Sequence, residues 1–261
     1  MPKISAIVHV YNEEAQIGRC LDSLKWADEI LLVDTFSTDR TVEIARAYTD
    51  RILQHTYVNA ATTKNWALEH APECDWLLFV DADEVVSNPL AEEIRQAIQE
   101  TAYTGYTINI LTHLGGKPSR STYWNPNYQI RLFRKGCGGW EDREVHAHFQ
   151  LQGSSRRLEH PILHFPYPNL ETCIVKINRY TSFEAKQMLR EVRSLRDLRF
   201  PVRSILRSVL QFYRLYIYHR GYRDGIEGFV ISFLSAIYPF LADAKYWEMA
   251  SGCVIDLKNE R

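Results

Sequence analysis

Three carboxylates within four residues are the densest chemical signal in the first half of the sequence. Asp81, Asp83 and Glu84 follow the apolar run 76–80. Like charges this close repel one another unless a cation lies among them. Hard cations such as Mg²⁺ and Mn²⁺ take oxygen ligands and share them with substrate phosphates. We therefore expect Asp81 and Asp83 to bind Mg²⁺ or Mn²⁺, although solvated loop acids or a helix cap would show the same pattern.

Polar residues also follow the two earlier apolar runs of the sequence. Asp34 directly follows the run 29–33. Its carboxylate can accept hydrogen bonds from a base or a ribose, or it can serve only in an Asx-turn. Tyr11 follows the first apolar run, and its ring can stack on a base. Glu13 and Glu14 suit the first turn of a helix, which explains these acids without a ligand.

Two further segments carry ionisable groups. Lys64 can meet a pyrophosphate, although an isolated lysine is more often a surface residue. The stretch 138–148 reads GGWEDREVHAH and is the densest in ionisable residues. A carboxylate there can deprotonate an attacking hydroxyl. His146 and His148 share one face of a strand and can complete a metal shell, but a charged edge strand would look the same.

Alternating strands and helices must position these residues. Apolar runs rich in β-branched residues predict strands over 4–10, 29–33, 51–54 and 76–80. Helical spacing predicts helices over 12–25, 38–48, 60–70 and 89–100. Strands buried on both faces that alternate with helices indicate a parallel, doubly wound α/β sheet. Ligands of such sheets bind beyond the carboxyl ends of the strands, where the polar residues above fall.

The pattern changes in the second half of the chain. Strands separated by Gly, Pro and Asn turns are predicted over 106–112, 128–133 and 145–151. They indicate antiparallel strands added to the parallel sheet. After Pro168 the chain reads as helices to its end. We therefore expect an α/β domain over 1–168, with a parallel half 1–101 and a half 102–168 that adds antiparallel strands, and a helical region over 169–261.

Composition excludes several classes of protein. The 261 residues are 46% hydrophobic and 24% charged, with a formal net charge of -1. This is typical of a soluble globular protein and supplies no field that recruits nucleic acid. The five cysteines form no CxxC pair, which argues against a disulfide framework or a zinc site. The N-terminus reads as a buried strand and not as a signal peptide, so the expected compartment is the cytoplasm.

The helical C-terminal region combines basic and apolar residues. Arg203, Arg207 and Arg214 fall on one helical face. The run 228–242 is free of charges but shorter than the ~20 residues that span a bilayer, and Pro239 interrupts it. A basic, aromatic-rich region fits the inner face of the plasma membrane, where it would contact anionic lipid. Packing on the protein core or on a second copy of the chain remains equally open.

Taken in order, these segments resemble the family 2 glycosyltransferases of the GT-A fold. The N-terminal blocks are VYNEE, LLVDTFSTDRTVEIA, TTKNWAL and WLLFVDADE. The segments YQIRLFRKG, WEDREVHAHF, HPILHFPYP and KINRYTSFEA resemble the branch that contains the lipopolysaccharide-core β-1,4-glucosyltransferase. The similarity covers about residues 4–186. Each block is modest alone, and their order makes the signal strong.

The resemblance implies an inverting transfer of a sugar, commonly from a UDP-sugar, onto a glycan or glycolipid of the cell surface. Carried over, Tyr11, Glu13 and Asp34 would contact the nucleotide. Lys64 would face the diphosphate, which a divalent metal would bridge to Asp81 and Asp83. Relatives often carry a glutamate where Ala147 follows His146 here. The base therefore falls to Asp142, Glu141 or Glu144, of which we favour Asp142.

Two other functions remain open from the sequence. A non-catalytic module that binds nucleotide-sugar or glycan would share the fold, and the altered Val-His-Ala segment is its support. The intact Asp81 and Asp83 argue against it. A sugar nucleotidyltransferase would share the α/β core and the metal-binding acids, but the VYNEE and KNWAL blocks resemble glycosyltransferases instead.

Overall fold

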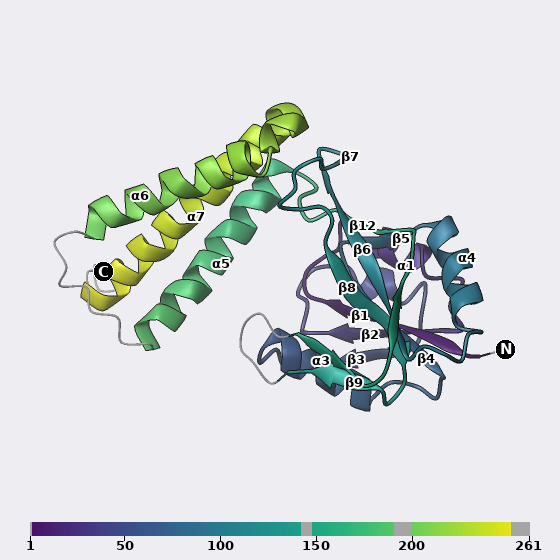
Figure 1. The fold of residues 1–261 in the computed structure, drawn as a ribbon. Coiled ribbons are helices and arrows are strands. Elements are labelled where there is room, and N and C mark those ends of the chain that lie inside the picture. The colour runs from purple at the N-terminus through teal and green to yellow at the C-terminus, as the bar shows by residue number, and fades with distance from the viewer. Residues whose placement is uncertain (1, 142–147, 191–199, 252–261) are drawn as a thin grey trace, which may run out of the picture. The chain divides into compact units, whose positions relative to one another are not determined.

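A computed structural model describes residues 2–141, 148–190 and 200–251 (Figure 1). The chain divides into two compact units. The first comprises residues 1–112 and 126–165, and the second comprises residues 113–125 and 166–261. The loop 113–125 thus belongs with the C-terminal helices, although it lies between strands of the first unit in the sequence.

The first unit is built on a mixed, mostly parallel sheet with the strand order β3-β2-β1-β4-β8-β6-β12-β5. Its parallel part consists of β1 (Ile4–Val10), β2 (Glu29–Asp34), β3 (Ile52–Gln54) and β4 (Trp76–Asp81). The other strands are β5 (Glu84–Val86), β6 (Gly105–Leu114), β8 (Tyr128–Arg134) and β12 (Ile162–His164). The short strands β7 (Lys117–Pro118) and β11 (Ser155–Arg157) pair with β6. The α/β class with added antiparallel strands is confirmed.

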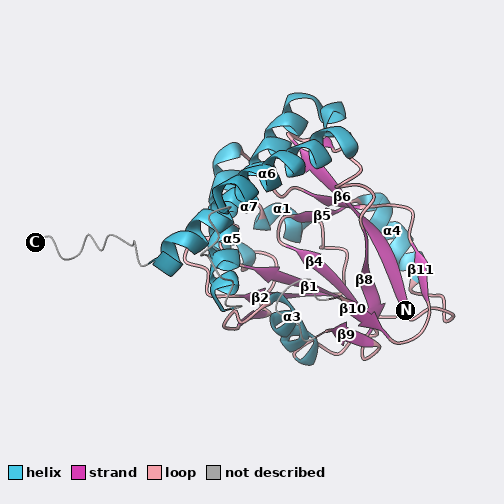
Figure 2. Cartoon of the chain, turned by 60° about the vertical axis from the view of Figure 1, so that its left-hand side comes forward, coloured by secondary structure: helices cyan, strands magenta, loops and turns pink. Residues whose placement is uncertain are grey.

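Both faces of the parallel strands are covered, as their continuous apolar sequences require. One face packs on α1 (Ile17–Asp22), α2 (Thr41–Ala45) and α4 (Asn88–Ala97). The other packs on α3 (Ala60–Glu69) and on the hairpin of β9 (Gly138–Trp140) and β10 (Phe149–Leu151) (Figure 2). Alternate residues of each strand therefore enter two separate apolar cores.

The first helix begins later than its sequence pattern predicts. A helix was expected from residue 12, but α1 starts at Ile17. Asn12 has a left-handed backbone with φ 51°, and its N–H donates to Ser37 Oγ at 2.9 Å. The Asn12 side chain also accepts from the Thr38 N–H at 2.7 Å. The segment after β1 is therefore held by the loop after β2, and these bonds replace the first helical turns.

The second unit consists mainly of helices, as predicted. They are α5 (Leu170–Arg190), α6 (Phe200–Phe212) and α7 (Gly225–Ser251). A π-helical segment (Tyr213–Tyr218) and a 3₁₀ turn (Gly221–Asp224) join α6 to α7. Figure 1 shows the three long helices side by side, with α6 running opposite to its two neighbours.

Pro239 does not interrupt the last helix, contrary to our expectation. The residue lies inside α7, which is 27 residues long and ends 12 residues later at Ser251. A proline in a helix loses one backbone hydrogen bond and typically costs ~3 kcal/mol. Packing of α7 along α5 and α6 offsets that cost. Among the described residues, the helical stretch 221–251 is long and apolar enough to cross a membrane, by length and composition alone.

Candidate active site

The loops after β1 and β2 are joined by a set of hydrogen bonds at one end of the sheet. The Glu13 N–H donates to Thr41 Oγ1 at 2.8 Å, and the Arg40 N–H donates to the Glu14 carboxylate at 3.0 Å. Tyr11 is half-buried beside these bonds. Glu14 thus has a structural role across the two loops. Tyr11 and Glu13 lie at the carboxyl end of β1, where the predicted nucleotide site requires them.

Asp34 is the last residue of β2 and is completely buried. Its carboxylate accepts from the Ser37 N–H at 3.1 Å and from Gln54 Nε2 at 3.0 Å. The first bond closes the turn after β2, but it spans three residues, whereas an Asx-turn bonds two residues on. The second bond comes from the end of β3 and holds the carboxylate at the edge of the sheet. Asp34 is therefore a fixed acceptor at the point where a ligand of a parallel sheet would lie.

Two cations flank the carboxylate of Asp81. Arg131 Nη2 lies 2.8 Å from Asp81 Oδ2, and Lys64 Nζ lies 3.6 Å from Asp81 Oδ1. Arg131 also pairs with Glu84 Oε1 at 2.7 Å, and Glu84 accepts from the Asp81 N–H at 2.8 Å. The buried Arg131 thus relieves part of the repulsion expected among the acids of this segment. Burial and the nearby Asp81 still raise the pKa of Glu84 to about 7.

The charges of this cluster shift the pKa values of its members in opposite directions. Burial alone would raise the pKa of Asp81, but Lys64 and Arg131 outweigh burial and hold it well below the usual range. Burial would lower the pKa of Arg131, and the carboxylates of Glu84 and Asp81 raise it instead. Asp81 and Arg131 therefore both remain ionised. This leaves Asp81 with both oxygens directed at cations.

Asp83 has a different environment from Asp81. Its Oδ1 lies 3.5 Å from Nε2 of His164, the last residue of β12. The other ring nitrogen, Nδ1, lies 3.4 Å from Thr112 Oγ1. The Asp83 carbonyl accepts from the Phe165 N–H at 2.9 Å, which fixes the two segments together. Asp83 and His164 thus form a carboxylate–imidazole pair beside the Asp81 cluster.

The pair can contribute to a divalent metal site only with help from the substrate. Within residues 2–141, 148–190 and 200–251 no three His, Cys, Asp or Glu side chains are grouped to hold an ion. Mg²⁺ is, however, commonly held by one or two carboxylates together with substrate phosphates. One carboxylate of this kind is present in Asp83, with a side chain that is 16% exposed. The residues fit a metal that binds together with a diphosphate.

Lys64 connects this cluster to the hairpin of β9 and β10. Its Nζ lies 5.5 Å from the centroid of the Trp140 ring. Asn65, the next residue on α3, exchanges two hydrogen bonds of 2.9 Å with the backbone of Trp140. Trp140 also packs on Phe79 of β4, with ring centroids 4.5 Å apart. The predicted diphosphate-facing lysine is thus held between Asp81 and the hairpin.

The proposed base lies in or next to that hairpin. Glu141 follows Trp140 directly, and its carboxylate accepts from Gln150 Nε2 at 2.9 Å. Asp142, Glu144 and His146 lie outside the described residues, so their roles stay predictions. In the sequence, Asp142 follows two residues after Trp140, whose ring lies near Lys64.

Sequence reasoning missed four residues of this site. They are His9, Glu84 as an ion-pair partner, Arg131 and His164. His9 lies opposite Asp81 in the sheet register, and burial lowers its pKa to about 4. For Arg131 a signal existed, because a charge in the middle of an expected buried strand needs a partner.

Residues 5–156 match the glycosyl transferase family 2, which covers more than half of the chain. The chain belongs to this family. It is 29% identical over 258 residues to the lipopolysaccharide core biosynthesis glycosyltransferase LpsC of Rhizobium meliloti (strain 1021), with 95% of this chain and 94% of that protein covered. An uncharacterized glycosyltransferase of Rickettsia typhi is 28% identical over 263 residues, with 96% and 88% covered. The similarity therefore extends beyond the first unit into the C-terminal helices.

The fold of this family 2 glycosyltransferase matches that of a solved structure. The structure of Staphylococcus aureus TarS 1–349 in complex with UDP-GlcNAc aligns with a TM-score of 0.50 and 17% identity. The alignment covers 96% of this chain and 92% of TarS 1–349. The GT-A fold predicted from the sequence is therefore confirmed, including the helical region that follows it.

Proposed function

We propose that the protein transfers a sugar from a UDP-sugar to a glycan acceptor of the cell surface, with inversion at the anomeric carbon. One observation carries the proposal. Asp34 and Asp81 end β2 and β4, the two strands that flank β1 in one sheet, and Lys64 pairs with Asp81. The carboxyl ends of such strands are where a doubly wound sheet binds its ligands.

The donor would lie across the ends of β1, β2 and β4. The fixed carboxylate of Asp34 is suited to accept hydrogen bonds from the base or ribose of the nucleotide. Tyr11 and Glu13 would contact the nucleotide from the end of β1. Lys64 is the cation best placed for the diphosphate. Its partner Asp81 is also paired with Arg131 through the other carboxylate oxygen, so Asp81 keeps a cation when Lys64 contacts the diphosphate.

A divalent cation would be held by Asp83 and the diphosphate, with His164 next to it. When bound, such an ion neutralises the charge that develops on the leaving diphosphate. Asp81 would orient Lys64 toward the same charge. His164 in turn orients Asp83, since its other nitrogen is near Thr112.

The transfer itself is a single displacement. The acceptor hydroxyl oxygen forms a bond to the anomeric carbon while the bond to the diphosphate oxygen breaks. The hydroxyl proton passes to a carboxylate, for which we favour Asp142, with Glu141 and Glu144 as the alternatives. No covalent enzyme intermediate is needed, so the configuration inverts.

The relatives support the class of donor and acceptor. LpsC is a lipopolysaccharide core biosynthesis glycosyltransferase, and it matches this chain over nearly its whole length. TarS was solved with UDP-GlcNAc. We therefore propose a UDP-hexose or related UDP-sugar as donor and a lipopolysaccharide core, capsule or other cell-surface glycan as acceptor.

The test is a screen of UDP-, GDP- and TDP-sugars with Mn²⁺, read out by thermal shift and by release of the nucleoside diphosphate. A UDP-sugar should raise the apparent melting temperature and be hydrolysed slowly without acceptor. Asp83→Asn should lose the hydrolysis, whereas the control Asp50→Asn removes an exposed carboxylate and should keep it. Binding without any turnover would favour the non-catalytic module, and release of pyrophosphate from an NTP would favour a nucleotidyltransferase.

A further inference from the structure

Helix α6 carries its apolar residues on the outside of the second unit. Five apolar side chains are between 55% and 70% exposed: Val202, Ile205, Leu206, Val209 and Leu210. Their spacing of three and four residues places them on one helical face, which Tyr213 extends by another turn. A helix on the surface of a soluble domain normally turns such a face toward the core. Here that face is directed away from it.

The inward side of α6 is polar instead. Ser204 is 1% exposed and donates to Asp243 Oδ2 of α7 at 2.7 Å. Arg207 lies 3.0 Å from the same buried carboxylate. Arg203 and Arg214 are exposed, as expected for a basic face. Arg207 is not part of that face, because it pairs with Asp243. Polar groups therefore join the two helices at this point, whereas at the end of α6 the ring of Phe212 contacts Phe229 and Phe233 of α7.

Helix α7 shows the same inversion. Its buried positions include the small residues Gly228, Ser232 and Ala236, spaced four apart. A Cβ at position 228 would overlap the Gly221 carbonyl oxygen, so the close approach requires glycine. The large side chains Phe229, Phe233, Phe240 and Trp247 are instead 43–51% exposed. The most apolar 18-residue window of this helical stretch has a mean hydropathy of 1.6, and only 22% of it is buried.

Small residues and polar pairs between helices, with large apolar residues outside, are typical of packing in a bilayer. In water this arrangement exposes a contiguous apolar patch without compensation. We propose that the outward faces of α6 and α7 insert into an anionic phospholipid membrane. The outer face is defined here by Val202, Ile205, Leu206, Val209, Leu210, Phe229 and Phe233.

The insertion is shallow and does not span the bilayer. Arg203 and Arg214 are 11 residues apart, which corresponds to about 16 Å of helix and is well below the ~30 Å hydrocarbon core. Helix α7 could not cross alone, because Lys245 ties it to α5 through bonds to Asn178 and Ser182. A crossing α7 would draw the charges of α5 into the hydrocarbon. The helices therefore lie along the surface, with the arginines reaching the headgroups.

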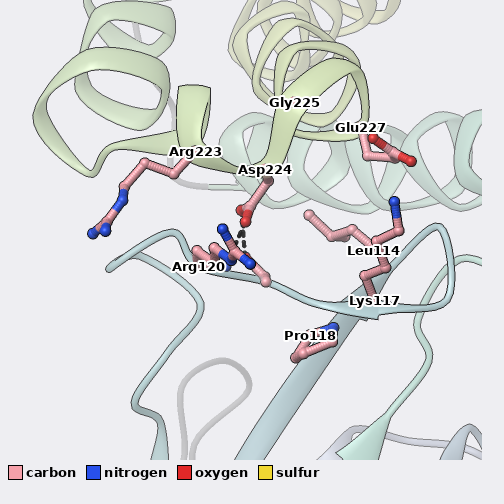
Figure 3. Close-up of a pocket in the computed structure, with 9 residues that line it drawn as sticks. Leu114, Lys117, Pro118, Arg120, Arg223, Asp224, Gly225 and Glu227 are labelled. Carbon is pink, nitrogen blue, oxygen red and sulfur yellow. Dashed lines mark hydrogen bonds between the residues drawn. The ribbon is translucent and has the colours of Figure 1, made fainter.

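A pocket with three cations at the start of α7 supports an anionic surface as the partner. Its volume is about 370 Å³, and Lys117, Arg120 and Arg223 line it together with the acids Asp224 and Glu227 (Figure 3). Asp224 in the pocket accepts from Ser119 Oγ at 2.7 Å and from the Ser121 N–H at 3.1 Å. Its carboxylate is therefore already hydrogen-bonded to the loop that contains these serines. Figure 3 shows Arg223 directed away from Asp224. A lipid phosphate fits this combination of cations better than an apolar protein surface does.

The experiment is flotation of the full-length protein with vesicles of phosphatidylcholine alone or with one-quarter phosphatidylglycerol. The variant Leu206→Ser/Val209→Ser/Leu210→Ser removes apolar area and no charge. It should lower the vesicle partition coefficient by about 100-fold, since insertion scales with the buried apolar area. The matched control Leu206→Met/Val209→Ile/Leu210→Met changes the same positions and should float like the wild type.

A second variant tests the choice of lipid. Arg120→Gln/Arg223→Gln should reduce binding to the anionic vesicles by about tenfold or more and leave the weak binding to phosphatidylcholine unchanged. Circular dichroism and donor binding should be unaffected, because these residues lie outside the candidate active site. The assay needs neither donor nor acceptor, so it is independent of the proposed reaction.

Two outcomes would overturn the proposal. A wild type that stays at the bottom of the gradient with anionic vesicles and sediments as a dimer would assign the outer face to a second copy. Equal flotation of the serine variant and the methionine–isoleucine control would show that α6 does not insert.

Discussion

Replacing Arg131 with methionine should destabilise the first unit far more than an ordinary surface substitution. The Arg131 side chain is 5% exposed and its partner Glu84 is 1% exposed, with 2.7 Å between them. The substitution would leave Glu84 buried and place it beside Asp81 without a shared cation. Breaking a buried ion pair from one side typically costs ~3–5 kcal/mol. That is a large part of the ~5–15 kcal/mol that usually stabilises a domain.

The assay is urea unfolding followed by the fluorescence of the buried Trp76. A loss of ~4 kcal/mol at a typical slope of ~2 kcal/mol/M moves the midpoint down by about 2 M. The double variant Arg131→Met/Glu84→Gln should recover most of the loss, because it removes both charges and keeps an acceptor for the Asp81 N–H. Arg134→Met is the control on the same strand, since Arg134 donates to backbone carbonyls and not to a carboxylate.

Two results would refute this reasoning. A loss below ~1 kcal/mol for Arg131→Met would mean that the pair behaves like an exposed salt bridge. A double variant no more stable than the single one would mean that the cost comes from lost packing and not from an uncompensated carboxylate.

Three further predictions follow from the site. Asp34→Ala should weaken UDP binding about tenfold or more, because a hydrogen bond to a charged group contributes ~1.5–3 kcal/mol; calorimetry that finds equal affinity would exclude its contact with the nucleotide. The pKa of His164 is raised by Asp83, so affinity for Mn²⁺ with UDP should increase from pH 6 to 8, and His164→Gln should flatten that dependence in the same titration. Burial lowers the pKa of His9 from 6.5 to about 4, so the unfolded chain takes up a proton first as pH falls. Up to about 3 kcal/mol of stability should be lost between pH 6.5 and 4, and a His9→Asn variant with the same acid sensitivity would contradict this.

The fold could be predicted from the sequence where local patterns decide it. The four parallel strands were predicted to within a residue or two because each is a continuous apolar run that both faces of the sheet bury. Helices α3 and α4 were also predicted closely from their helical spacing. In the structure Asn59 and Ser87 cap them. Strand β5 was missed because three residues next to an acidic turn carry no pattern of their own, and β12 supplies its partner from far along the chain.

The site was harder to predict than the fold for the same reason. Asp34, Asp81 and Asp83 could be singled out from their places at strand ends, whereas a role for Lys64 was favoured only through the family resemblance. Arg131 reaches Asp81 from 50 residues away. His164 reaches Asp83 from β12, whose position depends on β6 and β5. The spacing of residues in the sequence does not indicate that Arg131 pairs with Asp81 or that His164 pairs with Asp83. These pairs become visible only when the strands are assembled into the sheet.

The assembled site also separates the roles of two acids that look equivalent in the sequence. Asp81 faces two cations, and its lowered pKa keeps it a permanent anion that holds Lys64 in place. Asp83 pairs with the imidazole of His164, and we propose that it binds a metal together with a diphosphate. A diphosphate that binds between Lys64 and Asp83 would therefore be met by an ammonium group on one side and by the metal on the other. On the proposed mechanism Asp81 would act through Lys64, whereas Asp83 would bind the metal directly.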